Sequence, residues 1–204
     1  MPNLLQTLPS SMLIAERPPT EGASDEALAT RAPSDAGAFA LLYERYLDRV
    51  YRYCFRRLGS REAAEDATSL VFMKALAALP RFRGGAFRAW LFTIAHHVVV
   101  DRYRRAWSEQ SLETAGDLLD VAPSPEDLAL AADEWRIARG LLSHLPEHQR
   151  QVVELRLAGL TGAEIGEVLG RSAANVNVTQ YRALARLRAL AGVPDVPEER
   201  RDEG

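Results

Sequence analysis

Apolar side chains recur at intervals of three and four residues through most of this chain, and that spacing favours helices. Between residues 35 and 58 the pattern runs through Phe39, Leu42, Tyr46 and Val50. The alternating apolar and polar pattern that is typical of half-buried strands is not sustained anywhere, and no internal repeat is found. We therefore predict an all-α fold.

Helix-breaking residues divide this pattern into separate helices. Gly59 and Pro80 end the first two, and Gly84 and Gly85 precede the third. Five prolines lie within residues 1–33, so no stable element is expected there. The predicted helices span residues 35–58, 61–79, 87–107, 126–143, 147–158, 161–169 and 172–191.

Charge is distributed in blocks that the net charge of -3 conceals. Residues 44–105 and 135–192 are basic, whereas residues 106–134 carry acidic side chains and no lysine or arginine. This alternation predicts two small helical domains that meet a polyanion and are joined by an acidic linker. The expected organisation is a flexible N-terminal extension (1–33), a first helical domain (34–107), the acidic linker (108–130), a second helical domain (131–192) and an acidic tail (193–204).

Composition and motifs exclude several classes of protein. The longest nearly apolar stretch is interrupted by His96 and His97 and is shorter than the roughly 20 residues that cross a bilayer. The N-terminus lacks the basic start of a secretory signal, so we expect a cytoplasmic protein without membrane insertion. Cys54 is the only cysteine. No phosphate-binding glycine loop, metal-spaced His/Cys set or catalytic triad can be assembled, so we expect neither an enzyme nor a cofactor or metal.

The predicted helix 61–79 contains four consecutive apolar residues, Leu70 to Met73. Consecutive residues on a helix point about 100° apart, so one core cannot cover all four. Either this helix lies at the centre of its bundle, or part of its apolar surface docks on another protein.

The segment from Thr161 to Arg188 has the spacing of a helix-turn-helix. Gly166 is small where two helices must cross closely, Gly170 stands at the turn, and Ser172 can cap the following helix. On that helix one polar flank carries side chains suited to base edges and phosphates in a major groove, namely Asn175, Thr179, Arg182 and Arg186. An ordinary helical hairpin with a polar face is the alternative.

Two stretches carry a resemblance to a known family. Residues 39–105, with "LYERYLDRVYRYCFRRLG", "AAEDATSLVFMKAL" and "FRGGAFRAWLFTIAHHVVVDRYRR", resemble the second conserved region of extracytoplasmic-function (ECF) sigma factors, which belong to the sigma-70 family. The stretch "LPEHQRQVVELRLAGLTGAEIGEVLGRSAANVNVTQYRALARLR" resembles their fourth region. The two occur in the family's order, with an acidic linker between them.

The resemblance implies a sigma factor that directs core RNA polymerase to specific promoters and opens the minus-10 DNA for transcription initiation. Its partners would be the clamp and flap of the polymerase, promoter DNA and an anti-sigma factor. Docking on the clamp of the largest polymerase subunit would use the helix 61–79, and this favours docking over a central position for that helix. The implied polymerase-binding residues are Asp66, Ser69, Val71 and Phe72.

By the same resemblance, the loop at Phe82 and the helix after it would hold an unpaired base of the minus-10 element. Stacking such a base requires aromatic surface, and holding its backbone requires cations. Phe82 is the preferred stacking residue, whereas a core position is the more ordinary role for Trp90. The implied minus-10 residues are Phe82, Arg83, Arg88, Trp90, His97, Arg102 and Arg105.

The second domain would bind the minus-35 duplex through Arg171, Ser172, Asn175, Asn177, Thr179 and Arg182. Ser69 and Leu70 stand where the family usually has a glutamine and an acid, and His97 where it commonly has an asparagine. Asn177 and Thr179 replace frequent basic residues, which predicts fewer phosphate contacts.

The residues leave a second function open. The chain could be a helix-turn-helix regulator that binds duplex DNA and uses its N-terminal helices for sensing or dimerisation. The basic and aromatic stretch 82–105 discriminates the two functions, because a duplex-binding regulator has no use for a single-strand surface.

Overall fold

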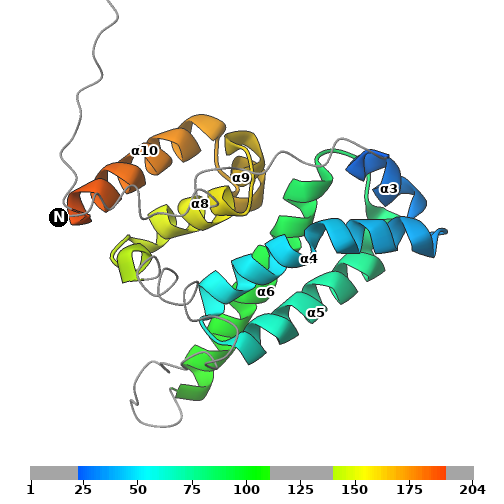
Figure 1. Ribbon diagram of the computed structural model, residues 1–204, viewed down its shortest axis with the longest axis horizontal. Coiled ribbons are helices and arrows are strands. Elements are labelled where there is room, and N and C mark those ends of the chain that lie inside the picture. Colours follow the sequence, from blue (N-terminus) through cyan, green and yellow to red (C-terminus); the bar gives the residue numbers. More distant parts are fainter. Residues whose placement is uncertain (1–22, 111–139, 192–204) are drawn as a thin grey trace, which may run out of the picture.

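The computed structural model describes residues 23–110 and 140–191, and all regular elements among them are helical (Figure 1). The all-α prediction is therefore confirmed. The α-helices are α3 (Asp25–Arg31), α4 (Ala36–Leu58), α5 (Arg61–Ala78), α6 (Phe87–Gln110), α8 (Glu147–Leu157), α9 (Gly162–Leu169) and α10 (Ala173–Leu190), with a 3₁₀ helix η1 at Leu79–Arg81. No helix in the described ranges is both long and apolar enough to cross a membrane.

Local sequence explains where the long helices of the first domain begin and end. The Asp35 carboxylate accepts hydrogen bonds from two backbone N–H groups of the first turn of α4, and the Ser60 hydroxyl accepts one from the N–H of Ala63 in α5. Gly59 ends α4 in the left-handed conformation, with a φ of 74°, which glycine adopts without strain. The predicted boundaries of α4 and α5 lie within one residue of the observed ones, whereas α6 ends three residues later than predicted.

The expectation of an unstructured segment up to residue 33 is wrong for Asp25–Arg31, which forms α3. Ser24 caps this helix, and Leu28 and Ala29 are buried. Asp25 accepts hydrogen bonds from Arg45 and from the Tyr46 hydroxyl of α4. A short helix with few large apolar groups is thus held by packing and by an ion pair with α4. Residues 1–22, residues 126–139 of the helix predicted at 126–143, the linker from 111 and the tail lie outside the described residues.

We call helices α3 to α6 the first domain, and its buried residues include Tyr53, Phe87 and Phe92. Val71 and Phe72 of α5 are buried in it, Leu70 is half-buried, and Met73 alone of these four consecutive apolar residues is exposed. Helix α5 therefore buries most of its apolar circumference within the domain.

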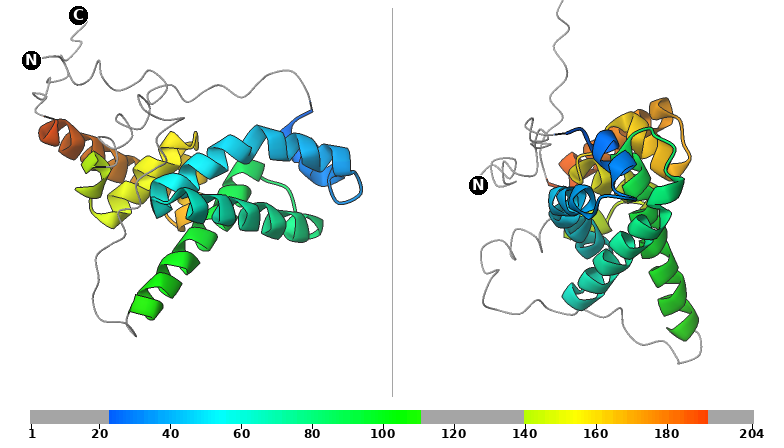
Figure 2. Two further views of the ribbon diagram at one scale, coloured as in Figure 1. Left: turned by 60° about the horizontal axis from the view of Figure 1, so that its bottom comes forward. Right: turned by 90° about the vertical axis from the view of Figure 1, so that its right-hand side faces the viewer.

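We call helices α8 to α10 the second domain, and these helices pack directly against the first group (Figures 1 and 2). Helix α9 lies on α6 and α8 lies beside the C-terminal part of α4. One core cluster runs across the junction and includes Val152, Leu155 and Ile165 together with the core of the first domain. The two domains are thus in contact despite the long chain segment between them, and we call this the closed arrangement.

Candidate polymerase and nucleic-acid interfaces

The segment from α9 to α10 has the geometry of a helix-turn-helix. A Cβ atom added to Gly166 would lie 2.5 Å from the backbone oxygen of Arg171, so only glycine fits this crossing. Gly170 ends α9 with a φ of 64°, and the Ser172 hydroxyl accepts a hydrogen bond from the N–H of Asn175. The steric roles predicted for Gly166, Gly170 and Ser172 match this geometry.

Helix α10 exposes most of the residues expected to meet the minus-35 duplex. Arg171, Ser172, Asn175, Asn177 and Arg182 are exposed. The Asn177 side chain lies over Gly162 at the start of α9, where its Oδ1 would be 2.8 Å from an added Cβ.

Thr179 does not belong to this exposed set, because only 8% of its surface is accessible. Its hydroxyl donates a hydrogen bond to Asn175 Oδ1 at 3.4 Å. The expectation that Thr179 faces DNA is therefore wrong here, and the residue instead orients the Asn175 amide from behind.

Two exposed side chains of α10 were missing from the expected set. Val178 is 51% exposed and Tyr181 is 70% exposed. The spacing of Val178 from Asn175 and Arg182, three and four residues, could have revealed it on the same flank of the helix.

The aromatic residues of the first domain form a cluster at the start of α6. The ring of Phe82 lies 5.3 Å from that of Trp90 and 5.9 Å from that of Phe87, between centroids. Phe87 is buried, whereas Phe82 and Trp90 are half-buried. Phe82 therefore presents only part of its ring outward, beside the exposed Gly84 and Gly85.

Arg88, expected at the minus-10 DNA, is bound by the second domain. Its Nε donates to Glu164 Oε1 at 2.9 Å, and its Nη1 donates to the backbone oxygen of Gly159 at 3.0 Å. Glu164 also closes the capping box of α9 with Thr161. The pKa of Glu164 is lowered, since these hydrogen bonds and Arg88 outweigh its burial. In the closed arrangement this arginine is not available to DNA.

The other polar residues expected at the minus-10 DNA lie just before α6 and along its outer part. Arg83, His97 and Arg105 are exposed, and so is Arg104, which was not in the expected set. The C-terminal turns of α6 project beyond the neighbouring helices (Figure 2). Arg102 Nη2 lies 3.3 Å from Asp66 of α5, so this pair joins an expected DNA contact to an expected polymerase contact. His97 follows Trp90 by seven residues and precedes Arg104 by seven, which places all three on one flank.

The expected polymerase-docking residues divide into two groups. Asp66 and Ser69 are exposed, but Val71 is fully buried and Phe72 packs against Tyr43 at 4.6 Å between ring centroids. Val71 and Phe72 therefore cannot form an exposed docking surface in this structure, and that expectation is wrong. Met73 and Leu76 continue the stripe of Asp66 and Ser69 and are 62% and 49% exposed.

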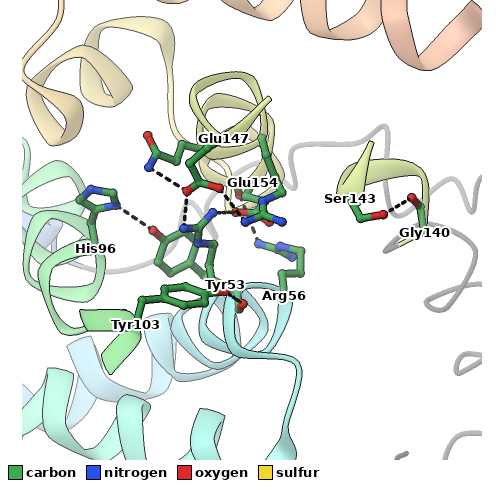
Figure 3. A network of polar contacts seen from close by, with 11 residues as sticks. Tyr53, Arg56, His96, Tyr103, Gly140, Ser143, Glu147 and Glu154 are labelled. Carbon is green, nitrogen blue, oxygen red and sulfur yellow. Dashed lines mark hydrogen bonds and ion pairs between the residues drawn. The ribbon is translucent and has the colours of Figure 1, made fainter. Parts of the chain in front are cut away.

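A network of charges centred on a buried ion pair joins the two domains beside α4 and α8 (Figure 3). Arg57 donates to Glu154 Oε2 at 3.1 Å and to Glu147 Oε1 at 2.6 Å. The Arg57 and Glu154 side chains are only 3% and 2% exposed. Arg150 also binds Glu147, at 2.6 Å, and the Tyr103 hydroxyl donates to the backbone oxygen of Arg57. We call this set the interdomain ion network.

Burial and ion-pair partners shift the pKa values of this network in opposite directions. Burial raises the pKa of Glu154, and Arg57 offsets part of that effect. The pKa of Arg57 lies above its ordinary value, because its two carboxylates outweigh the desolvation cost. The pKa of Glu147 is lowered by Arg57 and Arg150 in spite of its partial burial. Arg57 therefore stays charged and depends on carboxylates of the other domain.

His96 borders this network and supplies a prediction about pH. Burial, the Arg57 charge and His97 lower its pKa to about 4, and its Nδ1 lies 3.2 Å from the Tyr53 hydroxyl. In the unfolded chain the pKa of this histidine is about 6.5, so between that pH and pH 4 the imidazole is protonated in the unfolded chain but not in the folded one. The free energy of unfolding therefore falls as the pH falls. We expect a loss of about 1–2 kcal/mol between pH 7 and pH 5, allowing for partial solvation.

Denaturant unfolding at the two pH values would measure this loss. His96→Gln keeps a hydrogen-bonding group near Tyr53 and should show a smaller pH dependence than the native chain. An unchanged pH dependence of the unfolding free energy in this variant would assign the loss to groups other than His96.

Comparison with known proteins identifies two conserved regions in the chain. The family model described as Sigma-70 region 2 matches residues 42–109, and the model described as Sigma-70, region 4 matches residues 136–187. The ECF RNA polymerase sigma factor ShbA of Streptomyces griseus is 41% identical over 153 residues, covering 69% of this chain and 80% of its own length. The ECF RNA polymerase sigma factor BldN of Streptomyces coelicolor is 39% identical over 168 residues, covering 79% of this chain, and this chain spans only 62% of its length.

Solved structures show the same arrangement of helices. CnrH, solved in complex with the cytosolic domain of CnrY, matches with a TM-score of 0.65 at 27% identity, covering 82% of this chain and 97% of that chain. The sigma factor RpoE of Bartonella quintana matches in fold, with a TM-score of 0.66 at 23% identity over 77% of this chain and 98% of that chain. With both conserved regions matched in order, the chain belongs to the ECF sigma factors of the sigma-70 family, which function in promoter-specific transcription initiation.

Proposed function

We propose that the chain divides promoter-specific initiation among three surfaces. Core polymerase docks on the exposed stripe of α5, melted minus-10 DNA on the outer flank of α6, and the minus-35 duplex on α10. The observation that carries this proposal is the presence, in one chain, of a helix-turn-helix and a separate aromatic and cationic surface.

The docking stripe consists of Asp66, Ser69, Met73 and Leu76. Exposed methionine and leucine beside polar groups suit an interface whose centre is apolar and whose rim is polar. We place the contact with the polymerase clamp here, in place of Val71 and Phe72.

The minus-10 surface runs from Phe82 and Trp90 along His97 to Arg104 and Arg105. Half-buried aromatic rings can stack an unpaired base, and arginines along the helix can hold its backbone. Arg88 would join this surface once it leaves Glu164 and Gly159.

Simultaneous binding to both promoter elements requires the domains to separate. Elements centred ten and thirty-five base pairs upstream lie about 25 base pairs apart, or about 85 Å along straight duplex at 3.4 Å per base pair. Helix α6 itself spans only about 36 Å at 1.5 Å per residue. The packing of α9 on α6 would therefore be released when the chain engages polymerase and promoter.

A protein partner that holds the chain inactive is a further part of this proposal. CnrH, a relative in structure, was solved with the cytosolic domain of CnrY bound. An anti-sigma factor could act on this chain either by covering the α5 stripe or by stabilising the closed arrangement.

Run-off transcription with purified core RNA polymerase tests the proposed function. We expect specific transcripts only when both the chain and the core enzyme are present, and Arg182→Ala should reduce them while leaving core binding intact. Tight binding of the chain alone to duplex DNA, without transcripts from any promoter, would instead favour the duplex-binding regulator.

A further inference from the structure

The N-terminal half of α10 carries an exposed apolar spot within a polar surface. Val178 is 51% exposed, and the residues three and four positions away on the helix are Ala174, Asn175, Tyr181 and Arg182, all of them exposed. The closed arrangement covers none of these five residues.

The side chains of Asn175 and Arg182, which flank Val178, indicate which ligand this apolar spot binds. They flank Val178 on the same side of the helix, at spacings of three and four residues. Thr179 holds the Asn175 side chain from behind through its hydrogen bond to Oδ1. An amide oriented in this way and a guanidinium suit the base edges and phosphates of a major groove, so Val178 would lie between two DNA-binding side chains.

Among the base edges of the major groove, the thymine C5-methyl group is the apolar feature. Opposite any other base edge, a valine would displace water from a hydrogen-bond donor or acceptor of the base and offer no hydrogen bond in its place. Leaving that polar group unpaired costs free energy. Opposite a thymine, Val178 buries the C5-methyl group of the base against its own two methyl groups.

We propose that Val178 is a specificity-determining residue that selects thymine in the minus-35 duplex by contact with its C5-methyl group. This inference rests on the proposed function, since it requires that α10 enters the major groove. It assigns base selection to an apolar contact placed between Asn175 and Arg182.

Deoxyuridine substitution tests the contact, because it removes the methyl group and keeps the base pair. Holoenzyme assembled from the full chain and core polymerase would first select promoter duplexes from a random pool. Each thymine of the selected minus-35 element would then be replaced singly by deoxyuridine, and holoenzyme binding would be measured. We expect one position, or two adjacent positions, where the native chain binds about three- to fivefold more weakly, as for the loss of one buried methyl group.

Val178→Ala should bind the thymine promoter more weakly by a similar factor and lose nothing further on the deoxyuridine promoter. Val178→Thr, which keeps the branched shape and one methyl group, should retain part of the discrimination. Leu190→Ala removes an apolar side chain that is 44% exposed and lies about 18 Å along the same helix, at 1.5 Å per residue, and this variant should bind like the native chain.

Two results would overturn the inference: every thymine tolerates deoxyuridine, or Val178→Ala keeps the sensitivity of the native chain. Circular dichroism of each variant would confirm that its helices are intact. If holoenzyme selects no promoter duplex, the proposed function fails as well. A selected promoter that is insensitive to deoxyuridine overturns only the role of Val178.

Discussion

Replacing Arg57 with alanine is expected to destabilise the closed arrangement by about 3–5 kcal/mol, the usual cost of removing one partner from a buried ion pair. Glu154 would lose its nearest cation while it stays almost wholly buried at the domain junction. Arg150 is a weak substitute, because its Nε lies 3.9 Å from Glu154 Oε1. The variant can relieve this cost by separating the domains, which rehydrates Glu154.

Two measurements follow the effect of Arg57→Ala. Fluorescent labels on Lys74→Cys and Arg186→Cys, both exposed positions, would report the separation of the domains, and denaturant unfolding would report stability. Burial raises the pKa of the Cys54 thiol to about 11, so the introduced cysteines should react selectively. We expect a longer distance between labels and a lower midpoint of unfolding.

Matched variants separate the buried charge from general damage to α4. Arg52→Ala removes an exposed partner of Asp48 on the same helix and should change stability by less than about 1 kcal/mol. Adding Glu154→Gln to Arg57→Ala removes the buried carboxylate that has lost its partner, and it should recover part of the lost stability. An unchanged label distance and an unchanged unfolding midpoint in Arg57→Ala would show that the interdomain ion network does not hold the domains together.

Local features of the sequence predicted most of the helices because each boundary has a nearby chemical cause. Gly59, Gly170 and Ser172 act on the turn in which they lie, so their roles can be read without knowledge of the fold. Helix α3 was not predicted, because its stability comes from contacts with Arg45 and Tyr46 about twenty residues away.

The candidate surfaces were predicted less well, since exposure depends on the partners of each helix. A run such as Leu70–Met73 does not say which side faces the core, and the packing of Phe72 on Tyr43 settles it. Likewise, nothing in the sequence near Arg88 indicates that Glu164, 76 positions along the chain, accepts its hydrogen bond. The same limit hid the interdomain ion network, in which Arg57 and Glu154 are 97 positions apart in the sequence.

Leu76→Glu is expected to weaken binding to core polymerase by at least tenfold, about the loss that defines an important apolar contact at an interface. The side chain is 49% exposed, and leucine and glutamate are both good helix formers, so the fold should be unaffected. Titration of labelled core enzyme with the variant would measure this loss, and run-off transcription should fall in parallel.

Two comparisons decide whether the α5 stripe is the docking surface. Leu190→Glu places the same charge at a leucine of α10 that is 44% exposed, and it should leave the affinity for core enzyme unchanged. Val71→Ala, at a fully buried position, should lower the unfolding midpoint of the first domain while its folded fraction still binds core enzyme. If Leu76→Glu binds core enzyme as tightly as the native chain does, the docking surface lies elsewhere, because a buried Val71 cannot reach the polymerase without unfolding α5.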